Sequence, residues 1–98
     1  MAIDARSQAQ IGQRLAVTVT QKGDWGCICH EIDGLLEGIL LSRAQLERNG
    51  WSDPEMLAAS CAVDQLVLGS RIEVMVSRRE WSHGRHILYF GRGEQTNA

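Results

Sequence analysis

The amino-acid sequence predicts an all-β fold, a five-stranded OB-fold barrel with a short helical insert between strands three and four. Three observations predict it: five segments with the composition of β-strands, glycines where strands turn or bend, and a change to helical signals mid-chain. The 98 residues allow a single domain, since domains usually run to about 100–150 residues. We expect a flexible lead-in over residues 1–10, the barrel over 11–92 and a flexible tail over 93–98.

Three strands are expected in the first half of the chain. Residues 15–20 are rich in β-branched side chains, which favour a strand, and residues 22–24 (Lys-Gly-Asp) form a turn signal. A second strand is expected over residues 25–32. Asp-Gly at residues 33–34 is the strongest hairpin signal in the sequence and predicts a tight turn into a third strand over 35–41.

Helical signals occupy residues 42–63. A first short helical segment runs to Arg48 and is stopped by Asn-Gly at residues 49–50. Residues 53–62 are expected to form the only substantial helix and to close one end of the barrel. Ser52 and Glu55 have the spacing of a capping box at its start.

The second half of the chain predicts two more strands. Gly69 leads into a strand over residues 71–77, in which apolar and polar side chains alternate. A polar loop is expected over 78–84 and a last strand over 86–90. A five-stranded SH3-like barrel is the alternative, but it usually lacks a helical insert between strands three and four.

Composition and charge exclude several classes of protein. With 44% hydrophobic and 22% charged residues, the chain is neither disordered nor membrane-spanning. The net charge of -2 and the pI near 5.9 argue against a strongly basic nucleic-acid coat. The charge is uneven, -4 over residues 1–64 and +2 over 65–98, so an anionic partner would meet the C-terminal third first. No secretory signal precedes the fold, which predicts a cytoplasmic protein with free thiols.

Three segments resemble the S-one RNA-binding domain, an OB-fold family. Residues 24–29 (Asp-Trp-Gly-Cys-Ile-Cys) match the family's Asp-Phe-Gly-Ala-Phe-Val, and residues 37–42 (Glu-Gly-Ile-Leu-Leu-Ser) match its Glu-Gly-Leu-Val-His-Ile-Ser. Residues 84–89 (Gly-Arg-His-Ile-Leu-Tyr) match its Gly-Arg-Ile-Leu-Leu-Ser. The resemblance covers residues 11–92 and implies binding of single-stranded RNA.

The resemblance also assigns positions to the RNA-binding surface. Trp25 occupies the first base-stacking position and keeps an aromatic ring, and Arg85 keeps the basic residue that starts the last strand. Ile28 occupies the second stacking position and cannot stack, and Leu41 replaces the family's histidine. An acidic residue usually precedes the basic one, and Glu80 fills that place approximately. The chain therefore resembles the family more in the residues that form the scaffold than in those of the RNA-binding surface.

A second candidate surface is the expected loop before the last strand. Trp81 lies among Arg78, Arg79, His83 and Arg85, a composition that suits a single-strand nucleic-acid clamp. It also suits a protein-binding hot spot, in which Trp and Arg dominate, or a solvated hairpin tip. Two functions follow: weak binding of single-stranded RNA, or an S-one-like domain that acts as a protein-binding adaptor.

Catalysis, metal and cofactor binding find little support. Cys27 and Cys29 are separated by one residue, whereas structural zinc sites use pairs two to four residues apart, so both are expected to be buried core thiols. No nucleophile motif surrounds Cys61, and no glycine-rich phosphate loop precedes a helix. The sequence predicts neither an enzyme nor a cofactor.

Overall fold

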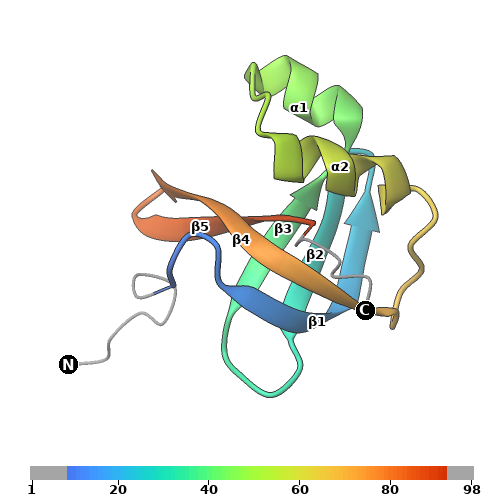
Figure 1. Cartoon of the computed structure of the whole chain (residues 1–98), viewed down its shortest axis with the longest axis vertical. Helices are drawn as coiled ribbons and strands as arrows, with labels where there is room; N and C mark the ends of the chain where they lie inside the picture. The colour runs from blue at the N-terminus through green and yellow to red at the C-terminus, as the bar shows by residue number, and fades with distance from the viewer. Residues whose placement is uncertain (1–8, 93–98) are drawn as a thin grey trace.

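The computed structural model describes residues 9–92 and shows one five-stranded sheet that closes on itself (Figure 1). The strands are β1 (Arg14–Gly23), β2 (Gly26–Glu31), β3 (Glu37–Leu41), β4 (Arg71–Ser82) and β5 (Arg85–Gly91). They neighbour one another in the order β1-β2-β3-β5-β4, and β4 pairs back with β1. All pairs are antiparallel except β3 with β5, which is parallel. A mostly β fold with five strands, and with its helices between β3 and β4, confirms that part of the prediction.

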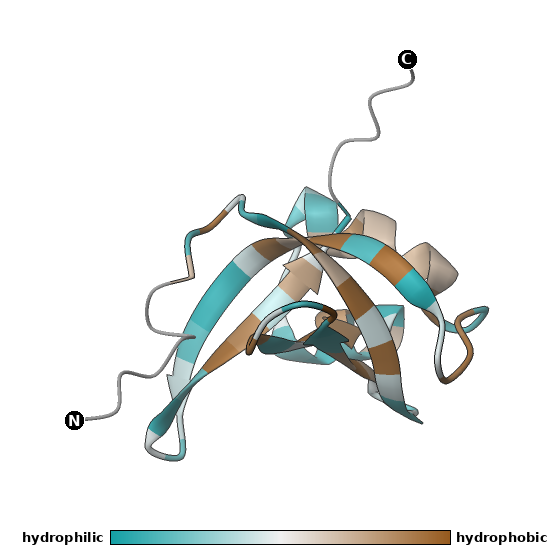
Figure 2. Ribbon diagram, turned by 90° about the horizontal axis from the view of Figure 1, so that it is seen from below, coloured by the Kyte–Doolittle hydropathy of each residue, from teal (hydrophilic) through white to brown (hydrophobic). Residues whose placement is uncertain are grey.

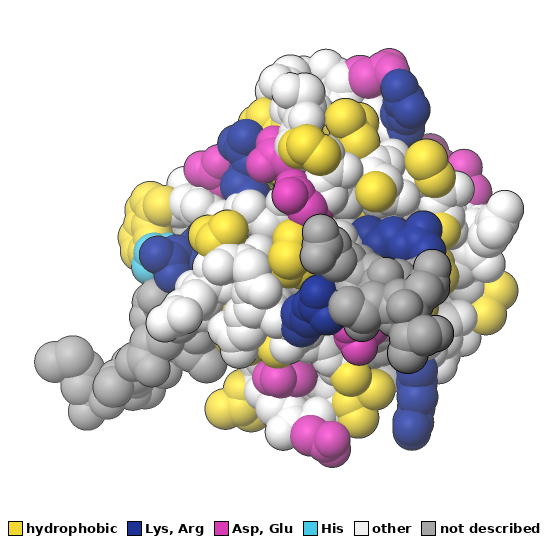
Figure 3. All heavy atoms as spheres, in the orientation of Figure 1, with side chains coloured by type: hydrophobic (Ala, Val, Ile, Leu, Met, Phe, Trp, Pro, Cys, Tyr) yellow, Lys and Arg dark blue, Asp and Glu magenta, His cyan; other side chains and the backbone are white. Residues whose placement is uncertain are grey.

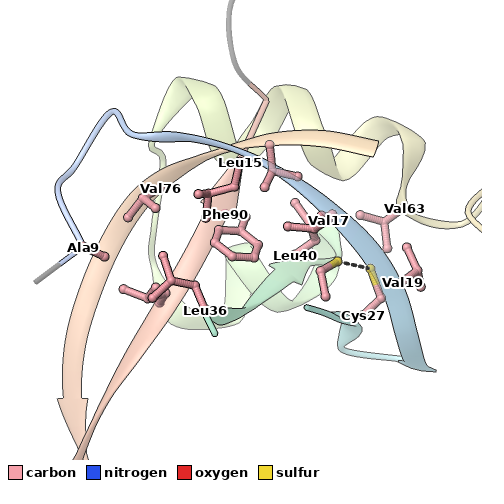
Figure 4. Packing of buried hydrophobic residues seen from close by; sticks show 13 residues of the cluster. Ala9, Leu15, Val17, Val19, Cys27, Leu36, Leu40, Val63, Val76 and Phe90 are labelled. Carbon is pink, nitrogen blue, oxygen red and sulfur yellow. Dashed lines mark hydrogen bonds between the residues drawn. The ribbon is translucent and has the colours of Figure 1, made fainter. Parts of the chain in front are cut away.

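Apolar and polar residues alternate along the strands (Figure 2). The apolar ones are buried together in one core cluster inside the closed sheet. Phe90 is fully buried near the centre of this cluster (Figure 4). Gly38 lies so close to the Phe90 ring that a Cβ built on Gly38 would be 2.5 Å from ring atom Cζ. Cys27 and Cys29 also point inward and are fully buried, with their sulfurs 3.9 Å apart. The predicted burial of both thiols is therefore confirmed.

Two helices connect β3 to β4, where the sequence predicted one substantial helix: α1 (Arg43–Asn49) and α2 (Pro54–Val63). Ser42 begins α1, and its hydroxyl accepts a hydrogen bond from the Gln45 amide at 3.2 Å. Gly50 ends α1 in the left-handed conformation (φ 72°), as the Asn-Gly signal predicted. The capping box at α2 was wrong: Asp53, rather than Ser52, takes the N-cap position, and it makes no side-chain capping bond.

The connection from β2 to β3 is longer than the predicted tight turn. β2 ends at Glu31 and β3 begins at Glu37, and the Glu31 amide donates to the Leu36 carbonyl at 2.8 Å. Leu36 is buried in the core cluster, so its side chain draws the connection inward before β3 starts. The Asp-Gly pair at residues 33–34 lies within this connection, and Gly34 does not need a positive φ.

The expected polar loop over residues 78–84 is instead a β-hairpin. β4 continues to Ser82 and pairs with β5 up to the Ser82–Arg85 pair. His83 (φ 52°) and Gly84 (φ 78°) form the turn, and two positive φ angles in a two-residue connection are typical of a type I′ turn. The alternation of apolar side chains fades here because this part of the hairpin extends beyond the closed sheet.

Candidate nucleic-acid interface

Four half-buried side chains lie side by side on the outside of the sheet, and we call them the outer row: Ile28, Ile39, Tyr89 and Arg78. Strand register pairs Ile28 with Ile39, Ile39 with Tyr89, and Tyr89 with Arg78. Their neighbours along β2, β3 and β5 are buried in the interior, so the outer row faces away from the core. This row crosses β2 and β3, the strands whose outer face binds oligonucleotides in OB folds.

The helices cover one end of this outer face. Leu41 is only 6% exposed and forms a second apolar cluster with Leu46 of α1 and Met56 of α2. Ile39 and Tyr89 pack against the edge of this cluster. The helical insert therefore folds onto Leu41, which the sequence analysis placed on the RNA-binding surface.

Arg78 is held by the insert rather than free to meet a phosphate. Its Nη2 lies 3.1 Å from Oδ1 of Asp53, and its Nη1 lies 2.9 Å from Oε1 of Glu80. The hydrogen bond that Arg78 donates to Asp53, with a further one to Glu80, raises the pKa of Arg78 above its ordinary value. The guanidinium also lies 4.1 Å from the ring centroid of Trp51, a cation–π contact. Arg78, predicted to belong to the RNA-binding surface, is therefore already paired with two carboxylates, and Glu80 pairs with Arg78 rather than with Arg85.

Two aromatic residues of the outer face were not assigned to a site from the sequence. Trp51 follows α1, and its ring meets that of Tyr89 edge-on, with centroids 4.9 Å apart and planes at 83°. Burial raises the pKa of Tyr89. The alternation of β5, with buried Leu88 and Phe90 on either side of Tyr89, was the signal that places this ring outside.

The hairpin tip separates the two residues that the sequence placed in one loop. Trp81 pairs with His86, and their rings meet edge-on with centroids 4.8 Å apart. Ser82 pairs with Arg85 at the next position, and adjacent positions of a strand point to opposite faces. Trp81, which is 66% exposed, therefore lies on the face of the hairpin opposite to Arg85.

The other predicted residues of this segment have local partners. Arg79 Nη1 donates to the Ala9 carbonyl at 2.7 Å, which attaches the N-terminal segment to β4. His83 is exposed in the turn, with Nδ1 2.8 Å from the Ser82 hydroxyl. Neither side chain lies in the outer row.

Trp25 and Arg85 mark opposite ends of the outer face. Trp25 is half-buried in the β1–β2 turn, where its ring lies beside Gly23 and its carbonyl accepts the Ser42 amide at 2.9 Å. β2 begins opposite Leu41, the last residue of β3, whereas Arg85 starts β5, which runs parallel to β3. One nucleotide therefore cannot contact both residues. Arg85 is exposed, and no ion pair is found for it within residues 9–92.

The charges around the outer row are of both signs. His30 Nε2 lies 2.7 Å from Oε2 of Glu37, and Nδ1 lies 2.7 Å from the Thr20 hydroxyl. When Nε2–H donates to the carboxylate, Nδ1 accepts from Thr20, and β1, β2 and β3 are linked across the surface. Figure 3 likewise shows basic and acidic side chains interspersed on the side it displays. A strongly basic track is not present on that side.

Among residues 9–92, no cluster of three or more His, Cys, Asp or Glu side chains is placed to hold an ion. Contact with the Cys27 thiol and burial raise the pKa of Cys29, so this buried thiol is held in its protonated form.

Neither helix of the described chain has the length and apolar sequence that crossing a membrane requires. Comparison of the chain with models of protein families, with curated proteins and with solved structures finds no match.

Proposed function

We propose that this chain is an OB-fold domain of S-one type that binds single-stranded RNA weakly through its outer face, without catalysis. The observation that carries the proposal is the order β1-β2-β3-β5-β4, together with an outer row that contains Tyr89. OB folds bind oligonucleotides on the face of strands two and three and on the loops that flank it. In this chain those loops are the Trp25 turn and the hairpin turn beside Arg85.

The proposed chemistry is stacking with limited phosphate neutralisation. The Trp25 and Tyr89 rings offer faces for bases, each worth about 1–3 kcal/mol, and Ile28 and Ile39 supply apolar contact between them. Arg85 supplies a positive charge that no described carboxylate pairs. Glu37 and Glu80 stand on the same face and repel phosphate, which is why we expect weak binding.

The test is a fluorescence titration of a ten-nucleotide oligouridylate at two salt concentrations. Arg85→Gln removes one phosphate contact, so the slope of log affinity against log salt should flatten by about 0.7. Trp25→Ala should weaken binding by about 1–3 kcal/mol with the slope nearly unchanged, because stacking releases few counterions. Arg43→Gln is the matched control, since Arg43 is exposed on α1 and pairs with Glu47. Absence of saturable binding by the wild type at low salt would refute the proposal.

A protein-binding adaptor is the second candidate, and the exposed Trp81 favours it. Its ring lies away from the outer row, on the hairpin face opposite to Arg85, so RNA held on the outer row does not cover it. Loss of Leu41 and Arg78 to the insert further narrows the surface left for RNA. Trp81→Ala should then leave the affinity for oligouridylate unchanged. The same variant should lose binding to a partner protein that both the wild type and Arg85→Gln bind.

A further inference from the structure

One edge of β4 lacks a strand partner at the end of the sheet next to α2. β4 pairs with β1 over residues 71–75, but its pairing with β5 starts only at Met75, opposite Gly91. Within the described chain, residues 71–74 therefore have no strand on their β5 side. Backbone N–H and C=O groups at such an edge are free to pair with another extended chain.

β5 stops at Gly91 because α2 lies in its path. A Cβ built on Gly91 would be 2.8 Å from Cβ of Glu55, so only glycine fits against the helix. The next amide, that of Arg92, donates to the Glu55 carbonyl at 3.0 Å and turns the chain toward α2. Within residues 9–92, no strand occupies the place beside β4 that a longer β5 would fill.

A groove of about 350 Å³ lies between this open edge and α2. Ala59 and Ala62 form its helical wall, and Leu40, Leu66 and Val74 contribute apolar surface. The small alanine side chains leave room beside the strand edge, and the volume is within the range of ligand pockets, about 300–1,000 Å³. Figure 1 shows β4 starting below α2, after the connection that joins them.

The surroundings of the groove define the chemistry of its occupant. Val67 and Leu68, which follow the groove residue Leu66 along the chain, are 65% and 63% exposed. Arg71 starts the open edge and Arg92 lines the groove, and neither has an ion pair within residues 9–92. Glu73 lies two residues after Arg71 on the open edge and also lines the groove. Its carboxylate disfavours a negative charge in the middle of the bound molecule.

We propose that this groove binds an extended peptide segment of a partner protein, which adds as a strand beside residues 71–74. The peptide is apolar in its centre, where it meets the alanine wall, and carries a carboxylate near each end for Arg71 and Arg92. Main-chain hydrogen bonds to the edge supply affinity and the groove selects alternate side chains, as in other cases of strand addition. A polynucleotide fits poorly, because the groove has no aromatic lining and contains Glu73. The site uses none of the residues proposed to bind RNA and is independent of that function.

The test uses the full chain and an acetylated, fluorescein-labelled peptide of sequence Glu-Val-Ala-Val-Ala-Glu. Wild type should bind it saturably, with slower hydrogen exchange at the amides of Arg71 and Glu73, which alternate with the residues whose backbone groups face β1. Methylation of alternate peptide nitrogens should abolish binding, and replacement of both glutamates by lysines should weaken it about tenfold. Arg71→Gln and Arg92→Gln should each weaken it about two- to fivefold.

A pair of substitutions on α2 locates the binding. Ala62→Phe fills the groove and should weaken binding tenfold or more, whereas Ala58→Phe, at an exposed position outside the groove, should leave it unchanged. Both sites are exposed, so the fold should survive, which circular dichroism checks. The proposal is overturned if the wild type does not bind the peptide, if the methylated peptide binds equally well, or if both phenylalanine variants behave alike. Competition by oligouridylate that Ala62→Phe abolishes would assign the groove to RNA instead.

Discussion

Replacing Gly38 by alanine should destabilise the fold through one defined contact. The new Cβ would lie 2.5 Å from Cζ of Phe90 and 2.6 and 2.8 Å from its two Cε atoms, and the fully buried ring has little room to move. Overpacking of this kind costs about 1–3 kcal/mol. Alanine also restricts the unfolded chain, which offsets about 0.4–1 kcal/mol. We expect the free energy of unfolding to fall by about 1–2 kcal/mol, measured by urea denaturation.

A double-mutant cycle separates this contact from other effects. Phe90→Leu removes the ring atoms that the new methyl group meets, so Gly38→Ala should cost less in the Phe90→Leu background, with a coupling of about 0.5–3 kcal/mol. Gly34→Ala is the control, because the nearest atoms there belong to the flexible Glu31 carboxylate, and its effect should stay within about 0.5 kcal/mol. The reasoning fails if Gly38→Ala is as stable as wild type, or if its cost is the same in both backgrounds.

Three further predictions concern titration, thiol access and the hairpin turn. Burial raises the pKa of Tyr89, so the folded protein keeps the phenol proton to higher pH than the unfolded chain, and the free energy of unfolding should fall as pH rises above about 10. In urea denaturation, the free energy of unfolding of Tyr89→Phe should fall less than that of the wild type between about pH 9 and 11. Equal losses would contradict this. Cys61 is exposed while Cys27 and Cys29 are buried, so one thiol per chain should react quickly with Ellman's reagent and the other two only on unfolding, whereas three fast thiols would disprove the packing. Gly84→Ala should cost about 1–2 kcal/mol in thermal or urea unfolding, because φ at Gly84 is 78°, and an unchanged stability would exclude that turn geometry.

Much of the fold could be predicted because its signals are local. Alternation and β-branched composition indicate five strands, although their ends shift by several residues. The predicted end of α1 at Gly50 is confirmed, because glycine adopts the left-handed conformation that ends a helix without steric cost. The inward direction of Cys27 and Cys29 follows from their spacing of two within one strand.

The surroundings of the candidate site residues depend on contacts between segments distant in sequence. Nothing near Leu41 shows that Leu46 and Met56 cover it, and Arg78 meets Asp53 only because the insert folds back on β4. The opposite directions of Trp81 and Arg85 could be predicted only once the segment was known to be a hairpin rather than a loop. The candidate site therefore depended on tertiary packing that composition and motif spacing do not encode.

The parallel contact between β3 and β5 constrains the order in which the molecule can form. It consists of two residue pairs, Gly38 with Leu88 and Ile39 with Tyr89, so each closes a loop of fifty residues. The β1–β2 and β4–β5 hairpins need only short loops and can form early. Closing the longer loop costs more chain entropy and gains little until those hairpins exist. During synthesis on the ribosome, the sheet cannot close until β5 has emerged, and until then the inward face of β3 remains without the ring of Phe90.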